Sequence, residues 1–512
     1  FFSSRRRHTR YGTVTGVQTC ALPIWFLNVE NKNRWTFLLF TWLPRFDPLL
    51  FLTRRINSEA PTGSAKAPWV QCVKALTNLI EQAETKDTQG KIRSNRLYDQ
   101  LVMISRCLPI LLLRVPKRAS SRTKEFIIRK NCKDFLSGSW PSLTSRALRD
   151  LHELNSTAQV LSEQPQHQCV SPSHSSKEQI ILRRVRDLQY SRAMNLLSSP
   201  GLSKGNSQDI YRALLDLHPQ EDSYSMDDAQ VSPVELQQFD FINGTWFAKQ
   251  IRQSKVGTAV DQWGWDSKEM WLPFLKDEEL MDNLATFWAR PLAMGYLPPQ
   301  YRADLAGGRL IALSKHPKEG IRPICITDAL RRLVAKGLYK CCKGSFAFVF
   351  EEQHPRAIQF GANLKDGAAH MFHLVQGIFE ESLKVSPDDD EPLAFAVFDV
   401  RNAFNELSRA QLASVFENGC PSAYNSNPSS PTNSQPGTQQ GNEALRYDIL
   451  WPHVQSHYGT KGSLKFYHNG VTYRIPSSKG VLQGDPLSSP LDRKSTRLNS
   501  SHSSVSRMPS SA

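Results

Sequence analysis

The spacing of apolar residues along the chain predicts several amphipathic helices. Apolar positions recur at helical intervals in four ranges: Val70–Ala83, Tyr98–Val115, Asp328–Lys343 and Asp366–Leu383. Three longer or less regular stretches also favour helix: Gln179–Leu217, Lys268–Ala293 and Leu445–Tyr458.

Two pairs of short apolar runs predict β-hairpins. In the first pair, Arg309–Leu313 and Ile321–Thr327 flank the polar turn Ser314–Gly320. In the second pair, Ser463–Tyr467 and Val471–Ile475 are separated by a turn that contains Asn-Gly, which is a strong hairpin signal. Helices and hairpins in one chain predict an α+β fold.

One further run, Leu393–Phe398, is continuously apolar and predicts a strand buried on both faces. It ends on Asp399, and the following Asn402–Arg409 changes to helical spacing. A carboxylate between a buried strand and a helix is well placed to hold a metal ion. This stretch alone equally allows an aspartate that caps the helix.

Composition fits a globular protein, with 40% hydrophobic and 22% charged residues in 512. That length predicts two to four domains. The formal net charge of +15 suggests a polyanionic partner. Part of the excess comes from residues 1–24 and 492–512, which lack periodicity and resemble translated sequencing-adapter read-through. Genuine disordered basic tails are the alternative.

The predicted organisation between these tails has four parts: a mainly helical region 25–154, a polar linker 155–178, a helical region 179–230, and an apolar-rich region 231–491 with a disordered insertion at 419–442. The basic run Lys117–Lys133 is either a solvated face or a nucleic-acid contact. The apolar Thr36–Leu52 is interrupted by Pro44 and Arg45, so we expect core and no membrane span. The nine cysteines form no CxxC pair, which favours a reducing compartment without specifying which one.

Three separated segments together resemble the reverse transcriptase domain of non-LTR retrotransposons. They are the basic hairpin with Lys315 and Arg322, the strand that ends on Asp399 at the start of DVRNAFN, and GVLQGDPLSSPL at Gly480–Leu491. The resemblance covers roughly Val231–Leu491. It implies the fingers and part of the palm of a right-hand polymerase, and therefore an RNA template, a DNA primer and deoxynucleoside triphosphates as partners.

The resemblance also implies two-metal nucleotidyl transfer. Asp399 matches the family's first metal-binding aspartate, and the Val400 carbonyl is a further candidate ligand. Mg²⁺ suits such oxygen ligands. The family's second catalytic motif, which carries two adjacent aspartates, has no counterpart after Leu491. We therefore expect this polypeptide to be a reverse transcriptase fragment that does not polymerise DNA by itself.

Other matched residues are implied to bind the nucleotide and the template–primer. Lys315 and Arg322 correspond to the clamp on the triphosphate, with Lys318 as a rival for the lysine role. Phe404 matches the steric gate that excludes a 2′-hydroxyl. Gly480, Gln483 and Gly484 match the family's G-x-x-Q-G, where the backbone approaches the nucleic acid. An RNA-dependent RNA polymerase is disfavoured by the phenylalanine, whereas a non-catalytic nucleic-acid-binding protein stays open as an alternative.

Overall fold

The computed structural model describes most of the chain between residues 38 and 491. The described ranges are 38–53, 58–88, 90–116, 119–163, 174–186, 190, 193–194, 197, 201–203, 205–221, 236–315, 319–342, 367–382, 402–417 and 449–491. The predicted metal ligands Asp399 and Val400 lie outside them, as do Lys318, the predicted strand Leu393–Phe398, the insertion 419–442 and both tails.

The described residues form an α+β fold with one mixed four-stranded sheet, which confirms the predicted class. The strand order is β2-β1-β3-β4, with these bounds: β1 Gly308–Ser314, β2 Ile321–Ile326, β3 Gly462–His468 and β4 Val471–Ser477. Both predicted hairpins are confirmed as antiparallel pairs. At the second turn, Asn469 and Gly470 have φ angles of 45° and 77°, the left-handed backbone that a tight hairpin requires.

The two hairpins are joined by parallel pairing of β1 with β3, from Gly308 opposite Leu464 to Leu310 opposite Phe466. Helix α8 (Ser207–Asp216) packs next to β2 and β4, and α12 (Arg302–Ala306) packs on β3. The sheet therefore brings together residues from the middle and the end of the chain.

The predicted helices Val70–Ala83 and Tyr98–Val115 are confirmed, within a series of four N-terminal helices. The bounds are α2 Lys66–Ala83, α3 Arg96–Leu112, α4 Ser121–Leu136 and α5 Trp140–Glu163. The Asn95 side chain accepts a hydrogen bond from the Tyr98 amide, and Ser120 does the same for Thr123. The described part of Thr36–Leu52 forms short helical turns, η1 Leu38–Trp42, η2 Leu43–Arg45 and η3 Pro48–Thr53, whose apolar side chains lie largely in the core.

The predicted linker 155–178 is partly wrong. Helix α5 continues to Glu163, and α6 (His174–Arg186) already begins before residue 178. The reason is visible in the sequence, because Leu151, Leu154, Ala158 and Leu161 maintain helical spacing through the polar residues.

The predicted helical stretch Lys268–Ala293 is helical over most of its length but is divided into several pieces. The pieces are η7 Leu272–Lys276, α10 Glu278–Leu284, the π-helical η8 Ala285–Ala289 and α11 Arg290–Ala293. Pro273 lies in the first turn of η7, and Asp277 begins a new helix by accepting a hydrogen bond from Leu280.

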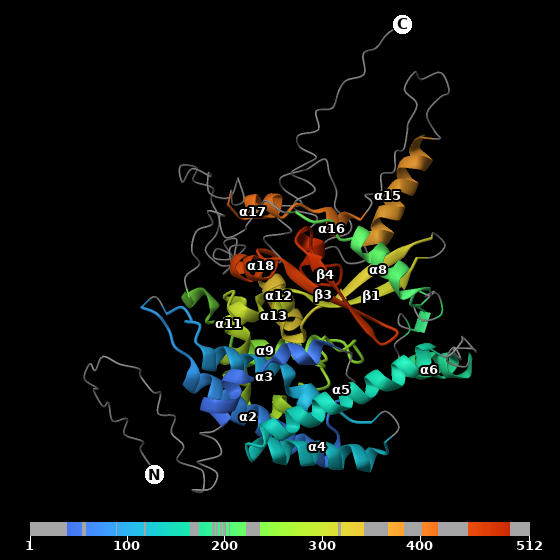
Figure 1. The fold of residues 1–512 in the computed structure, drawn as a ribbon. Coiled ribbons are helices and arrows are strands. Elements are labelled where there is room, and N and C mark those ends of the chain that lie inside the picture. The colour runs from blue at the N-terminus through green and yellow to red at the C-terminus, as the bar shows by residue number, and fades with distance from the viewer. Residues whose placement is uncertain are drawn as a thin grey trace, which may run out of the picture.

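The N-terminal helices and the central region share one hydrophobic core. The Trp69 indole donates to the Met270 carbonyl (3.0 Å), and the Trp265 indole donates to the Ser105 carbonyl (3.1 Å). The predicted division between 25–154 and 231–491 is therefore not a boundary in packing. Figure 1 shows α2 to α5 gathered at one end of the molecule, with the sheet and α8 further along.

The remaining helices surround this core and the sheet. Their bounds are α9 Gly244–Gln253, α13 Ala329–Cys341, α15 Gly367–Ser382, α16 Ala403–Glu406, α17 Arg409–Glu417 and α18 Trp451–Tyr458, with short turns at η4 Gly63–Ala65, η6 Leu236–Phe239 and η9 Pro299–Tyr301. The predicted helices at Asp328–Lys343 and Asp366–Leu383 are confirmed. Among the described helices, none combines the length and the apolar content that crossing a bilayer requires.

Candidate functional site

The β1–β2 hairpin presents two cations on one face of the sheet. Arg322 lies opposite Leu313, and the Lys315 amide donates to the Gly320 carbonyl at 2.9 Å, which continues the ladder. Residues that lie opposite each other on paired strands point to the same face of the sheet, and so do residues two apart along one strand. Lys315 is two residues after Leu313, which lies opposite Arg322, so Lys315 and Arg322 are diagonal neighbours on one face. Both side chains are exposed. They are available to an anion such as a triphosphate.

The loop that follows β4 connects this hairpin to α16 through backbone hydrogen bonds. The Cys325 amide of β2 donates to the Gln483 carbonyl (2.8 Å). On the other side, the Gly480 amide donates to Leu407 (2.8 Å) and the Val481 amide donates to Phe404 (2.7 Å). Three segments that are far apart in the sequence are thus brought into contact.

Two glycines make these contacts possible. Gly480 has φ +70°, and a Cβ at this position would collide with the backbone of Phe404 and Asn405. Gly484 has φ +119°, and a Cβ there would collide with the Cys325 carbonyl. Both positions combine a left-handed backbone with a close approach between main chains, which only glycine accommodates without strain.

Phe404 is half-buried on α16 and packs against the core. The backbone before it is unusual, because Asn402 adopts φ +56°. The side chains of Asn402 and Asn405 both donate to the Leu217 carbonyl, at 2.9 and 2.7 Å. These bonds fix the short helix that presents the phenylalanine.

The segment Leu217–Glu221, here called the strap, connects the parts of this unit, and no motif in the sequence indicates it. The Glu221 carboxylate accepts from the Ser408 hydroxyl (3.0 Å) and from the Arg409 amide (3.1 Å) at the start of α17. The Glu221 amide donates to the Ser478 hydroxyl (2.9 Å) just before Gly480. The strap therefore ties α17 to the glycine loop.

A buried ion pair anchors the C-terminal end of the glycine loop to α13. Asp485 pairs with Arg331 of α13, and both side chains are only 1% exposed. Burial lowers the pKa of Arg331, but the charge of Asp485 and its hydrogen bond, together with Tyr458 and Cys325, outweigh burial and the pKa is raised. Asp485 also accepts from the Leu487 amide (2.9 Å), and a helical turn follows at 488–491.

A second buried arginine holds the other end of the loop. Arg409 donates to the carbonyls of Gly480 (3.1 Å), Tyr458 (3.0 Å) and Thr460 (3.0 Å). Burial lowers the pKa of Arg409 to about 10. Arg331 and Arg409 both lie over the Tyr458 ring, at 5.1 and 5.5 Å from its centroid. Sequence reasoning missed both arginines, although each occupies the apolar face of its helix.

Two buried histidines of α18 make stability depend on pH. Burial lowers the pKa of His453 to about 4 and that of His457 well below its ordinary value, and Arg331 lowers both further. In the unfolded chain both histidines bind a proton as the pH falls below about 6.5, whereas in the folded chain they stay neutral to a lower pH. The stabilisation is therefore complete above about pH 6.5 and is lost as the pH falls toward 4.

We expect His453→Gln to abolish the part of the acid-dependent loss of stability that comes from protonation of His453. Between pH 6.5 and 5, the wild-type protein should lose about 2 kcal/mol more of its free energy of unfolding than the variant. Urea denaturation at several pH values measures this difference. Identical pH profiles for both proteins would contradict it.

The metal ligands expected from the sequence cannot be placed, because Asp399 and Val400 lie outside the described residues. Within the described ranges, no group of three or more histidine, cysteine, aspartate or glutamate side chains could hold a metal ion. The described part of the site is thus a cationic hairpin, a glycine loop and a short helix.

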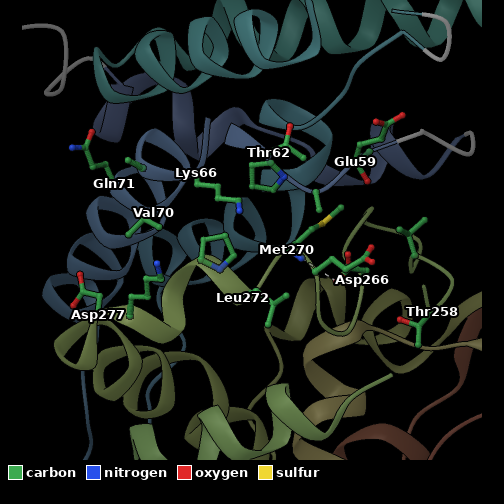
Figure 2. A pocket seen from close by; sticks show the side chains of 18 residues that line it. Glu59, Thr62, Lys66, Val70, Gln71, Thr258, Asp266, Met270, Leu272 and Asp277 are labelled. Atoms are coloured by element: carbon green, nitrogen blue, oxygen red, sulfur yellow. Dashed lines mark hydrogen bonds between the residues drawn. The ribbon is translucent and has the colours of Figure 1, made fainter. Parts of the chain in front are cut away.

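A separate groove of about 1120 Å³ lies between α2 and the segment 258–277. Figure 2 shows Lys66 extending from α2 toward this space, with Glu59 and Asp266 also on its wall. Its lining mixes acidic, basic and apolar side chains. None of the residues predicted to bind the nucleotide lines it. The groove belongs to the junction between the N-terminal helices and the central region.

Comparison with known proteins leaves the family unassigned. No family model matches the chain, and a search of curated proteins found no significant match.

Proposed function

We propose that this chain belongs to an RNA-directed DNA polymerase of non-LTR retroelement origin, with the described sheet and glycine loop in its fingers and palm. The observation that carries the proposal is the loop Gly480–Gly484, which is hydrogen-bonded to β2 on one side and to α16 on the other. The three motif segments that resemble the family are adjacent in space wherever they are described. Motif matches arising by chance would give no reason for this adjacency.

In the proposal, each described segment has a part in holding substrates. Lys315 and Arg322 bind the triphosphate of the incoming deoxynucleotide, since Arg offers a bidentate fork and Lys a point charge. Phe404 lies beneath the sugar and excludes a 2′-hydroxyl. Gln483 and the exposed backbone of Gly484 contact the template–primer, while the missing side chain of Gly484 makes room for the Cys325 carbonyl.

In a polymerase that carries the full set of catalytic carboxylates, the reaction joins the primer to the nucleotide. The primer 3′-hydroxyl loses its proton and attacks the α-phosphorus, a new phosphodiester bond forms, and pyrophosphate leaves. Asp399 and the Val400 carbonyl would hold Mg²⁺, which supplies neutralisation of the developing charge on the phosphates. The alternative is a non-catalytic nucleic-acid-binding protein, which would bind RNA or DNA in a salt-dependent way without selecting nucleotides.

Arg322→Ala tests the triphosphate clamp. A charge-assisted hydrogen bond contributes about 1.5–3 kcal/mol, so the variant should bind deoxynucleoside triphosphate at least about tenfold more weakly. Arg322→Lys should bind with intermediate affinity, because it keeps the charge and loses the fork. Equilibrium dialysis of a labelled nucleotide, with Mg²⁺ and an RNA–DNA template–primer present, measures the affinity.

Arg474→Ala is the matched control for this experiment. Arg474 is also an exposed arginine on an edge strand of the same sheet, but it lies on β4, at the opposite edge from β2. Its removal should leave nucleotide affinity unchanged. Equal losses in the Arg322 and Arg474 variants would indicate a general charge effect and refute the clamp.

A further inference from the structure

The solvent face of helix α4 carries a stripe of cations around an exposed aromatic ring. Arg122, Arg129, Lys130 and Lys133 follow the positions i, i+7, i+8 and i+11, with Phe126 at i+4. All four cations are exposed, and the Phe126 side chain is 67% exposed. None of the four forms an ion pair with another residue in the part of the chain that the structure describes.

The acidic residues of the same helix do not neutralise this stripe. Glu125 accepts hydrogen bonds from Thr62 (3.3 Å) and from the Ser64 hydroxyl (3.1 Å). Asp134 forms an ion pair with Arg146 of α5 (2.6 Å). Both carboxylates are thus held by neighbouring elements, and neither forms an ion pair with a cation of the stripe.

We propose that this face of α4 binds the phosphodiester backbone of a nucleic acid, with Phe126 stacking on an unpaired base. From Arg122 to Lys133 the helix rises about 16 Å, whereas a strand of B-DNA advances about 3.4 Å per nucleotide. The stripe can therefore follow several phosphates. A ring among cations is the combination that single-stranded nucleic acid requires, since bases stack on aromatic faces while basic groups track the backbone.

An anionic membrane is the less favoured partner for the same charge. A helix that lies in a membrane interface needs a broad apolar face. The apolar residues Ile128, Cys132 and Phe135 of α4 are buried in the protein core, which leaves Phe126 as its one strongly exposed large apolar side chain. The exposed surface of α4 is therefore charged but lacks an apolar face that could insert into a membrane.

This binding surface is separate from the candidate nucleotide site. Helix α4 packs on α2, α3 and α5, and Figure 1 shows it at the end of the molecule away from β4 and α8. The inference does not depend on the proposed function, because it concerns other residues and its test uses nucleic acid alone, without a deoxynucleotide.

The test compares the full chain with Arg129→Gln/Lys130→Gln by fluorescence anisotropy, using labelled single-stranded RNA and duplex DNA over about 50–200 mM salt. We expect the variant to bind single-stranded RNA about tenfold more weakly or worse, and the slope of log affinity against log salt to fall by about 1.4. Lys91→Gln/Arg93→Gln removes the same charge from an exposed loop and should change neither quantity.

Phe126→Ala separates stacking from charge. It should weaken binding of single-stranded RNA about tenfold and leave duplex binding unchanged. Loss of binding to phosphatidylserine vesicles in the α4 double variant, with RNA binding intact, would overturn the proposal. Equal RNA affinities for the α4 variant and the Lys91/Arg93 variant would overturn it as well. The deoxynucleotide affinity of Arg322→Ala is measured in a separate experiment, so either proposal can fail while the other is still tested.

Discussion

Asp485→Ala is expected to lower the free energy of unfolding by about 3–5 kcal/mol, because it leaves the buried Arg331 guanidinium without its counter-ion. Arg331 is held in place in two further ways. It donates to the Ala306 carbonyl at 2.7 Å, and it lies over the Tyr458 ring. It therefore cannot reach water without disrupting α13 and the core. Chemical denaturation followed by circular dichroism measures the loss.

Two further variants identify the cause. Arg331→Met/Asp485→Leu replaces the whole pair with apolar side chains and should recover most of the lost stability. Glu406→Ala breaks the more exposed pair between Lys479 and Glu406 (3.0 Å) and should cost less than about 1 kcal/mol. If the Asp485 variant were no less stable than the Glu406 variant, the ion pair would not be buried as described.

Gly480→Ala is expected to destabilise the protein by at least about 2 kcal/mol. A left-handed backbone costs a residue with a Cβ about 1–2 kcal/mol. The collision with the backbone of Phe404 and Asn405 adds to this cost, because no flexible side chain is there to move aside. The loop would have to leave α16 to relieve it, so the hydrogen bonds from Gly480 and Val481 would also weaken.

Gly201→Ala separates the two contributions. Gly201 has φ +83°, yet no atom lies within 4 Å of a Cβ at this position, so only the backbone strain of about 1–2 kcal/mol applies. Gly377→Ala in α15 has neither problem and should be neutral or stabilising. Equal losses in the Gly480 and Gly201 variants would show that the loop does not pack against α16.

The hairpins could be predicted because their signals are local. The Asn469-Gly470 turn and the apolar runs around it specify a paired structure within a few residues. The parallel pairing of β1 with β3 has no such signal, since it joins strands separated by a large part of the chain. The same holds for the shared core, where Trp69 contacts Met270 across a sequence separation of 201 residues.

The site shows the same division between local and distant information. Lys315, Arg322 and the glycines of the loop could be named from motifs, and the hairpin register explains why the two cations share a face. Arg331 and Arg409 were missed because charged residues are expected in water. A closer reading of periodicity could have found them, because Arg409 shares its helix face with Leu412 and Phe416.

The most direct test of the proposed function is whether the complementary nucleotide stabilises a complex between this protein and an RNA–DNA template–primer. The primer would end in a dideoxynucleotide, and dissociation of the labelled duplex would be followed with Mg²⁺ present. We predict slower dissociation with the complementary deoxynucleotide than with the ribonucleotide or with a mismatched deoxynucleotide. Identical dissociation rates under all three conditions would contradict the polymerase assignment and favour a nucleic-acid-binding protein without nucleotide selection.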